Sequence, residues 1–121
     1  LNRIRSPFNV SAAAQAAGVA ALEDTAFFDL CLAHNQMWKP WLAEQIAALG
    51  LTVTPSATNF LLVHFPAGDV PKAEAALAEQ AVLVRGVAGY GLPNALRITV
   101  GTEEENRRVI AGLTAYREGA A

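Results

Sequence analysis

Residues 60–65 form a short and almost continuous apolar run in the middle of the chain. A run of this length, closed by Pro66 and Gly68, is typical of a strand buried inside a sheet. Residues 96–100 predict a second strand, because Leu96, Ile98 and Val100 alternate with two polar side chains. Whatever else the chain forms, it must therefore cover an apolar sheet.

The rest of the chain supplies helices for that purpose. Apolar residues at helical spacing predict helices over 11–22, 24–49, 71–80 and 102–119, and shorter strands are expected at 51–54 and 82–85. Pro40 falls inside the second helix, where a kink or a break is expected. Thr102 and Glu105 have capping-box spacing at the start of the last helix. This order predicts an α+β fold, in which helices cover one face of a small, largely antiparallel sheet.

Composition excludes several classes of protein. The chain has 121 residues, is 53% hydrophobic and carries a formal charge of −2, with no cluster of basic residues. These values suit one compact domain and argue against a nucleic-acid-binding protein. No apolar run approaches the roughly 20 residues of a membrane helix. Without a signal peptide, and with Cys31 as its single cysteine, the chain is expected to be cytoplasmic, and Cys31 is expected to be a buried, inert thiol.

Arg97 is the residue that most directly indicates a function. It lies in mid-strand with apolar neighbours, and no acidic residue is near it in the sequence. Burial of a guanidinium group without a partner is costly, and its planar fork fits a carboxylate. Three readings stay open from the residues alone: an anionic ligand, a distant internal acid, or an edge-strand arginine that faces water.

The remaining polar candidates are less specific. Arg85 opens a glycine-rich loop, and Asn59 begins the apolar strand, but either side chain could serve only solvation or local hydrogen bonding. The histidines have no neighbours at metal-ligand spacing, so no metal site is expected. The two lysines, Lys39 and Lys72, are both expected to face solvent, although a lysine that forms an imine must lie in a pocket.

Four segments together resemble one enzyme family. They are RSPFNVS at 5–11, PSATNFLLV at 55–63, VRG at 84–86 and LRITVGTEEEN at 96–106. Their order and spacing are similar to those of the C-terminal part of histidinol-phosphate aminotransferases, which are class II, fold-type I enzymes. The resemblance spans almost the whole chain, and the last segment is its most specific part.

The resemblance implies a function and a set of residue roles. The family uses pyridoxal phosphate to transfer an amino group between L-glutamate and imidazole acetol phosphate in histidine biosynthesis. Arg97 matches the arginine that binds the substrate carboxylate, and Arg85 matches an arginine near the substrate phosphate. Asn9 and Asn59 fall near the mouth of the active site. A homodimer that acts on an amino-acid-like substrate, with no nucleic acid or membrane partner, is also implied.

The resemblance also implies a division of the chain. Residues 1–22 match a segment that crosses between domains, and residues 23–121 match the small, substrate-clamping domain. The family's large cofactor-binding domain, with its cofactor-linking lysine, lies upstream of the matched region. The chain by itself is therefore expected to bind pyridoxal phosphate weakly and to be inactive.

Other functions remain compatible with these features. An aromatic-amino-acid aminotransferase or a threonine-phosphate decarboxylase shares the small-domain layout and the carboxylate-binding arginine. A stand-alone anion-binding α+β module is a different class, in which Arg85 and Arg97 would act without a large domain. A purely dimerising domain is a third class, because the apolar residues Phe27, Trp38 and Trp41 need cover.

Overall fold

The computed structural model describes residues 10–119 and divides the chain into two compact units, Leu1–Ala33 and His34–Ala121. Asn9, one of the predicted site residues, lies outside the described residues. None of the described helices has the length and apolar character that a membrane crossing requires. The predicted boundary between a connecting segment and a small domain, at residue 22, stays a prediction.

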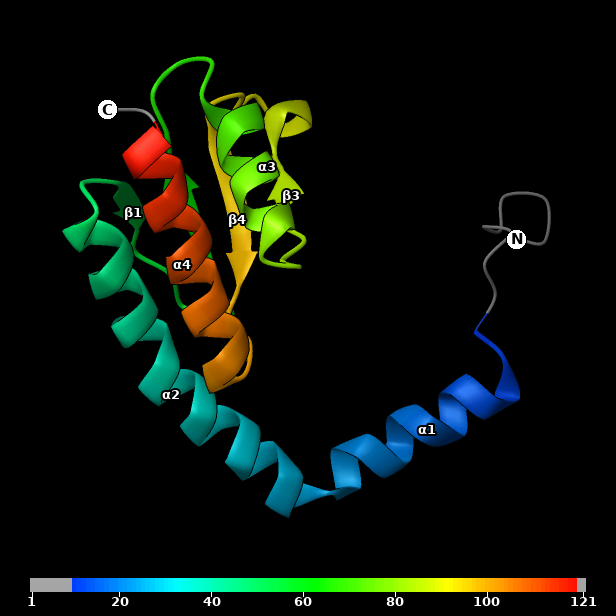
Figure 1. Ribbon diagram of the computed structural model, residues 1–121. Coiled ribbons are helices and arrows are strands. Elements are labelled where there is room, and N and C mark those ends of the chain that lie inside the picture. The colour runs from blue at the N-terminus through cyan, green and yellow to red at the C-terminus, as the bar shows by residue number, and fades with distance from the viewer. Residues whose placement is uncertain (1–9, 120–121) are drawn as a thin grey trace, which may run out of the picture. The chain divides into compact units, whose positions relative to one another are not determined.

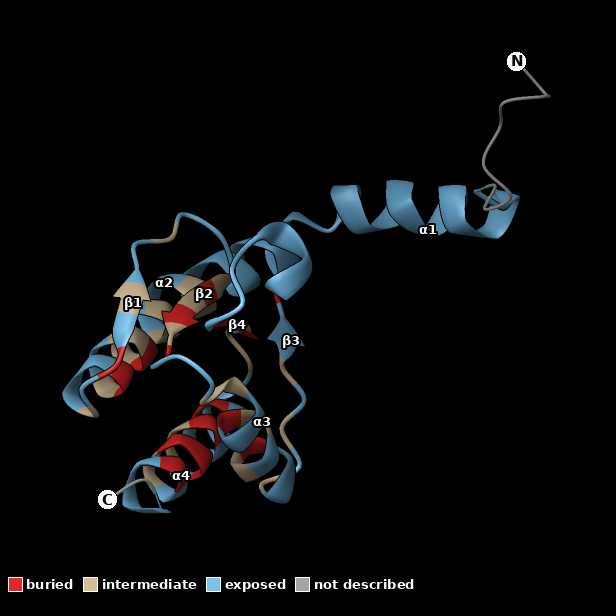
Figure 2. Cartoon of the chain, turned by 90° about the horizontal axis from the view of Figure 1, so that it is seen from above, coloured by how far each residue is buried: buried red, intermediate tan, exposed pale blue. Residues whose placement is uncertain are grey.

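The first unit is helical. Helix α1, Ala12–Glu23, begins where the Ser11 hydroxyl accepts a hydrogen bond from the Ala14 amide at 3.1 Å. Helix α2, Thr25–Ala48, is preceded by Asp24, whose carboxylate accepts a hydrogen bond from the Phe27 amide. The helix continues into the second unit. Figure 2 shows α1 exposed along its length.

The structure differs from two expectations for α2. The expected break at Pro40 is absent, because the helix runs unbroken through that residue, while a kink there stays a prediction. Cys31 is exposed and not buried. The reason is that the core of the described chain begins only further along α2, at Leu42 and Ile46, so nothing described there covers the thiol.

The second unit is built on a four-stranded antiparallel sheet. The strands are β1 (Thr52–Thr54), β2 (Phe60–His64), β3 (Arg85–Gly86) and β4 (Ala95–Thr99), in the spatial order β1-β2-β4-β3. Helices α3 (Val70–Glu79) and α4 (Glu103–Gly119) complete the unit, with a short 3₁₀ helix, η1 (Ala88–Tyr90), after β3. The predicted α+β fold is confirmed (Figure 1).

The helices cover one face of this sheet. Leu61 and Val63 of β2 alternate with half-buried residues, and Leu96 and Ile98 of β4 alternate with half-buried Arg97 and exposed Thr99. These four side chains pack with the buried residues of the helices, which are Leu42, Ile46, Ala73, Leu77, Val109, Leu113 and Tyr116. The strand period of two thus separates a buried face from an open one, and the open face is available for a ligand.

The predicted strand at 82–85 is wrong except at its last residue. Helix α3 ends in a Schellman turn, in which the Val82 amide donates to the Leu77 carbonyl and Ala81 takes a positive φ of 57°. Val82 and Val84 then pack on the core while Leu83 is 93% exposed. Val82 and Val84 are half-buried, but pairing with β4 starts only at Arg85.

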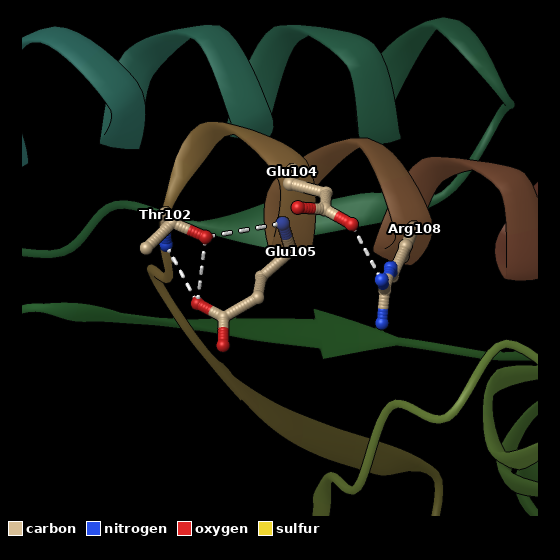
Figure 3. A network of polar contacts seen from close by, with 4 residues as sticks. All are labelled: Thr102, Glu104, Glu105 and Arg108. Carbon is tan, nitrogen blue, oxygen red and sulfur yellow. Dashed lines mark hydrogen bonds and ion pairs between the residues drawn. The ribbon is translucent and has the colours of Figure 1, made fainter.

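The predicted capping box at the start of α4 is confirmed (Figure 3). The Glu105 amide donates to the Thr102 hydroxyl, and the Thr102 amide donates to the Glu105 carboxylate at 2.8 Å. The carboxylate accepts from the Thr102 amide and also from the Thr102 hydroxyl at 3.0 Å, and these two bonds, the amide's first, hold the pKa of Glu105 below its usual value. They fix the point at which β4 gives way to α4.

Candidate functional site

Arg85 and Arg97 are direct neighbours on the open face of the sheet. They are opposite each other in the register of β3 and β4. Directly opposed residues of an antiparallel pair point to the same face, a few ångströms apart, and like charges in such positions destabilise the pair. None of the ion pairs within residues 10–119 includes either arginine. The sheet therefore holds two adjacent positive charges without an internal counter-ion among the described residues.

Arg97 packs beside an aromatic ring of the neighbouring strand. Its guanidinium carbon lies 5.0 Å from the centre of the Phe60 ring. Phe60 lies on the same face of the sheet, two residues before Leu62, the cross-strand partner of Arg97. The Arg97 Nε atom is shielded from solvent and has no hydrogen-bond partner among the described residues. A shielded donor of this kind loses its bond to water without compensation, unless an external acceptor reaches it. Of the three readings left open by the sequence, an internal acid is excluded within residues 10–119.

Arg85 is exposed, and it has one polar partner. Its Nη2 atom donates to the Tyr90 hydroxyl oxygen at 3.0 Å. Tyr90 was missed in the sequence analysis, where the loop after Arg85 was considered for its glycines alone. The sequence does contain one indication of this contact, because an aromatic residue lies five positions after the arginine that opens the loop.

The backbone of Asn59 helps to hold β2 and β4 together. It is exposed at the start of β2, and its carbonyl accepts a hydrogen bond from the Val100 amide at 2.9 Å. The loop before it is anchored to α2, because Lys39 Nζ donates to the Thr58 carbonyl at 3.1 Å. These contacts align the start of β2 with the end of β4. A ligand-binding role for the Asn59 side chain stays a prediction.

A second group of contacts holds the end of β4 in place. Asn106 is fully buried, and its amide group bonds to both backbone groups of Gly101, at 2.9 Å and 3.0 Å. His34 Nε2 lies 2.8 Å from the same Gly101 carbonyl. Arg107 lies over the Trp38 and Trp41 rings, which meet edge to face at 5.1 Å, so the two tryptophans pack against each other and against α4. The strand that carries Arg97 is thus fixed at its far end.

The lysines do not fit the role of linking pyridoxal phosphate. Lys39 is half-buried, not solvent-facing as expected, and its Nζ is bonded to a backbone carbonyl. Lys72 is exposed and forms an ion pair with Asp69 at 2.9 Å. These are the only lysines in the sequence, and neither lies on the sheet face that carries the arginines. The described site therefore fits an anionic substrate group and not the anchoring of the cofactor.

Comparison with known proteins agrees with the motifs. Histidinol-phosphate aminotransferases from Paramagnetospirillum magneticum and from Rhodopseudomonas palustris are 54% and 48% identical to the chain over 119 residues. The alignments cover 96% of this chain and 33% of each relative, so the chain spans about a third of the length of the curated relatives it matches.

A solved structure gives the same result. Histidinol-phosphate aminotransferase from Sinorhizobium meliloti, in complex with pyridoxal-5'-phosphate, superimposes with a TM-score of 0.76 at 27% identity, over 99% of this chain and 33% of that one. The model of the family "Aminotransferase class I and II" matches residues 1–113. The resemblance carried by the four sequence segments is confirmed, and the chain belongs to the class I and II aminotransferases.

Proposed function

We propose that the chain is the substrate-binding, C-terminal part of a histidinol-phosphate aminotransferase, an enzyme of histidine biosynthesis. In this proposal Arg97 binds the carboxylate of L-glutamate, and Arg85 binds the phosphate of imidazole acetol phosphate or histidinol phosphate. The observation that carries the proposal is the pair of opposed arginines without an internal counter-ion among residues 10–119. The names of the relatives support the choice of substrate.

The chain's own residues bind and orient the substrate. Two N–H groups of the Arg97 fork suit the two oxygens of a carboxylate, and the Phe60 ring supports the guanidinium group from its side. A rigid strand is a good carrier for such a clamp, because misplacement of a substrate by about 1 Å can cost a large part of the rate. Cofactor binding is assigned to the two thirds of the relatives' length that this chain does not match.

A chimeric enzyme tests this function. The matched third of the Paramagnetospirillum magneticum enzyme would be replaced by this chain, and amino transfer would be measured with histidinol phosphate, phenylalanine and threonine phosphate. Activity highest with histidinol phosphate is expected. A preference for phenylalanine, or decarboxylation of threonine phosphate, would favour the alternative enzymes. In the chimera, Arg97→Lys should raise the KM for glutamate, because lysine cannot form the two parallel bonds.

The functional division and the assembly are part of the same proposal. Residues 1–22 would connect the domains, residues 23–121 would form the small domain, and the enzyme would be a cytoplasmic homodimer. Support for an apolar contact comes from the first unit, which exposes the large apolar side chains Val19, Leu22, Phe27, Phe28, Leu30 and Leu32. Light scattering of the chimera tests the assembly, and a monomer at high concentration would contradict it.

A further inference from the structure

Tyr90 is the residue that holds Arg85, and a short structured turn holds Tyr90. It ends η1, where the Tyr90 amide donates to the Val87 carbonyl at 2.9 Å. Gly91 follows with a φ of 79°, a left-handed conformation that favours glycine. Val87, at the start of the turn, is buried. The backbone of Tyr90 is therefore fixed, although its side chain is 70% exposed.

The hydrogen bond between Arg85 and Tyr90 has only one possible direction. A guanidinium group has five N–H donors and no acceptor, so the phenol oxygen must accept from Arg85 Nη2. The phenol's own proton therefore points away from Arg85. The arginine keeps its other N–H groups, and it also lies 5.8 Å from the centre of the Tyr90 ring. The pair thus presents an O–H donor beside a positive charge.

The two arginines and the phenol match different anions to different degrees. A carboxylate has two oxygens, which the fork of Arg97 can bind by itself. A phosphate monoester has three terminal oxygens and close to two negative charges near neutral pH. The additional oxygen and charge require a further donor and a further cation. Arg85, the cross-strand neighbour of Arg97, can provide the cation, and Tyr90, which is bonded to Arg85, can provide the donor.

We propose that Tyr90 determines specificity for phosphate over carboxylate, by donating its phenol proton to a phosphate oxygen of the substrate and by positioning Arg85. This proposal rests on the proposed function, since it assumes that Arg85 binds phosphate. It assigns a role to a loop residue that the motifs did not single out. It also explains why an exposed arginine on a two-residue edge strand is held by an aromatic partner.

The test is a titration of the 121-residue chain with methyl phosphate and with acetate, followed by NMR of the arginine side chains. Tyr90→Phe removes the hydroxyl and keeps the ring. We expect the affinity for methyl phosphate to fall about fivefold to tenfold, as for the loss of one hydrogen bond to an anion, and the affinity for acetate to change less than about twofold. Tyr116→Phe is the matched control, because Tyr116 packs in the core and bonds Asp69.

The outcomes separate this proposal from the one on which it rests. If Arg85→Met abolishes methyl phosphate binding and Tyr90→Phe leaves it unchanged, Tyr90 has no part in selectivity and the arginine site stands. If neither Arg85→Met nor Arg97→Met affects either anion, the proposed function fails as well. A uniform loss for both anions in Tyr90→Phe would show a general disturbance of the loop and would also overturn the selectivity.

Discussion

Asn106→Ala should destabilise the second unit more than any other single replacement of a polar residue in residues 34–119. Asn106 is the one buried polar residue among the described residues, with an exposed fraction of 0%. Its carboxamide accepts a hydrogen bond from the Gly101 amide and donates one to the Gly101 carbonyl. Gly101 lies just beyond Thr99, the last residue of β4 that pairs with β2. Alanine removes both bonds and leaves a cavity.

The magnitude follows from these contacts. The Gly101 carbonyl keeps His34, but the Gly101 amide loses its partner in a shielded place, which costs about 1–3 kcal/mol. The lost packing of the side chain adds about 1 kcal/mol. We therefore expect the free energy of unfolding to fall by about 2–4 kcal/mol. Asn106→Leu, which restores volume without the hydrogen bonds, should recover about 1 kcal/mol of this loss.

Urea denaturation followed by circular dichroism measures the change. Asn94→Ala is the matched control, since Asn94 is exposed and its carbonyl, not its side chain, accepts from the Phe65 amide. That control should stay within about 0.5 kcal/mol of the unmodified chain. A loss of less than about 1 kcal/mol in Asn106→Ala would refute the reasoning, because the Gly101 amide would then have found another partner at little cost.

Three further changes test other parts of the fold. Ala81→Gly should raise the free energy of unfolding by about 0.5–1 kcal/mol, because φ is 57° there and glycine adopts such angles without strain; a lower urea midpoint would contradict this. Gly112→Ala should lower the free energy of unfolding by about 1 kcal/mol, measured by the same urea denaturation. A Cβ at this position would lie 3.1 Å from backbone atoms of α3, and this steric clash outweighs the gain in helix propensity. Asp69 accepts hydrogen bonds from Lys72 and from Tyr116, and these bonds, that of Lys72 first, lower the pKa of the Asp69 carboxyl group from its usual 3.8. The ionised carboxylate therefore stabilises the fold fully above pH 3.8, and this stabilisation is lost as the pH falls through the lowered pKa. Asp69→Asn should therefore flatten the acid limb of a stability profile, and an unchanged limb would count against it.

The elements that the sequence predicted well are those specified by local contacts. The start of α4 depends on Thr102 and Glu105, three residues apart, and the structure shows both bonds of the box. The short extent of β3 depends instead on a turn after α3 in which Ala81, not a glycine, takes the left-handed conformation. Glycine is the usual signal for that turn, so the sequence did not mark it. The prediction of a longer strand failed for this reason.

The site was predictable only in part, for a related physical reason. Arg97 could be identified because a charge within an apolar strand is unusual in any fold. Its relation to Arg85 depends on the register of β3 with β4, which joins residues on either side of a loop and cannot be read from strand periodicity. That register places the two charges opposite each other, and Tyr90 reaches Arg85 from within the same loop. One hairpin therefore positions both cations and the phenol, so a change in the loop between β3 and β4 should alter anion selectivity before it alters the fold.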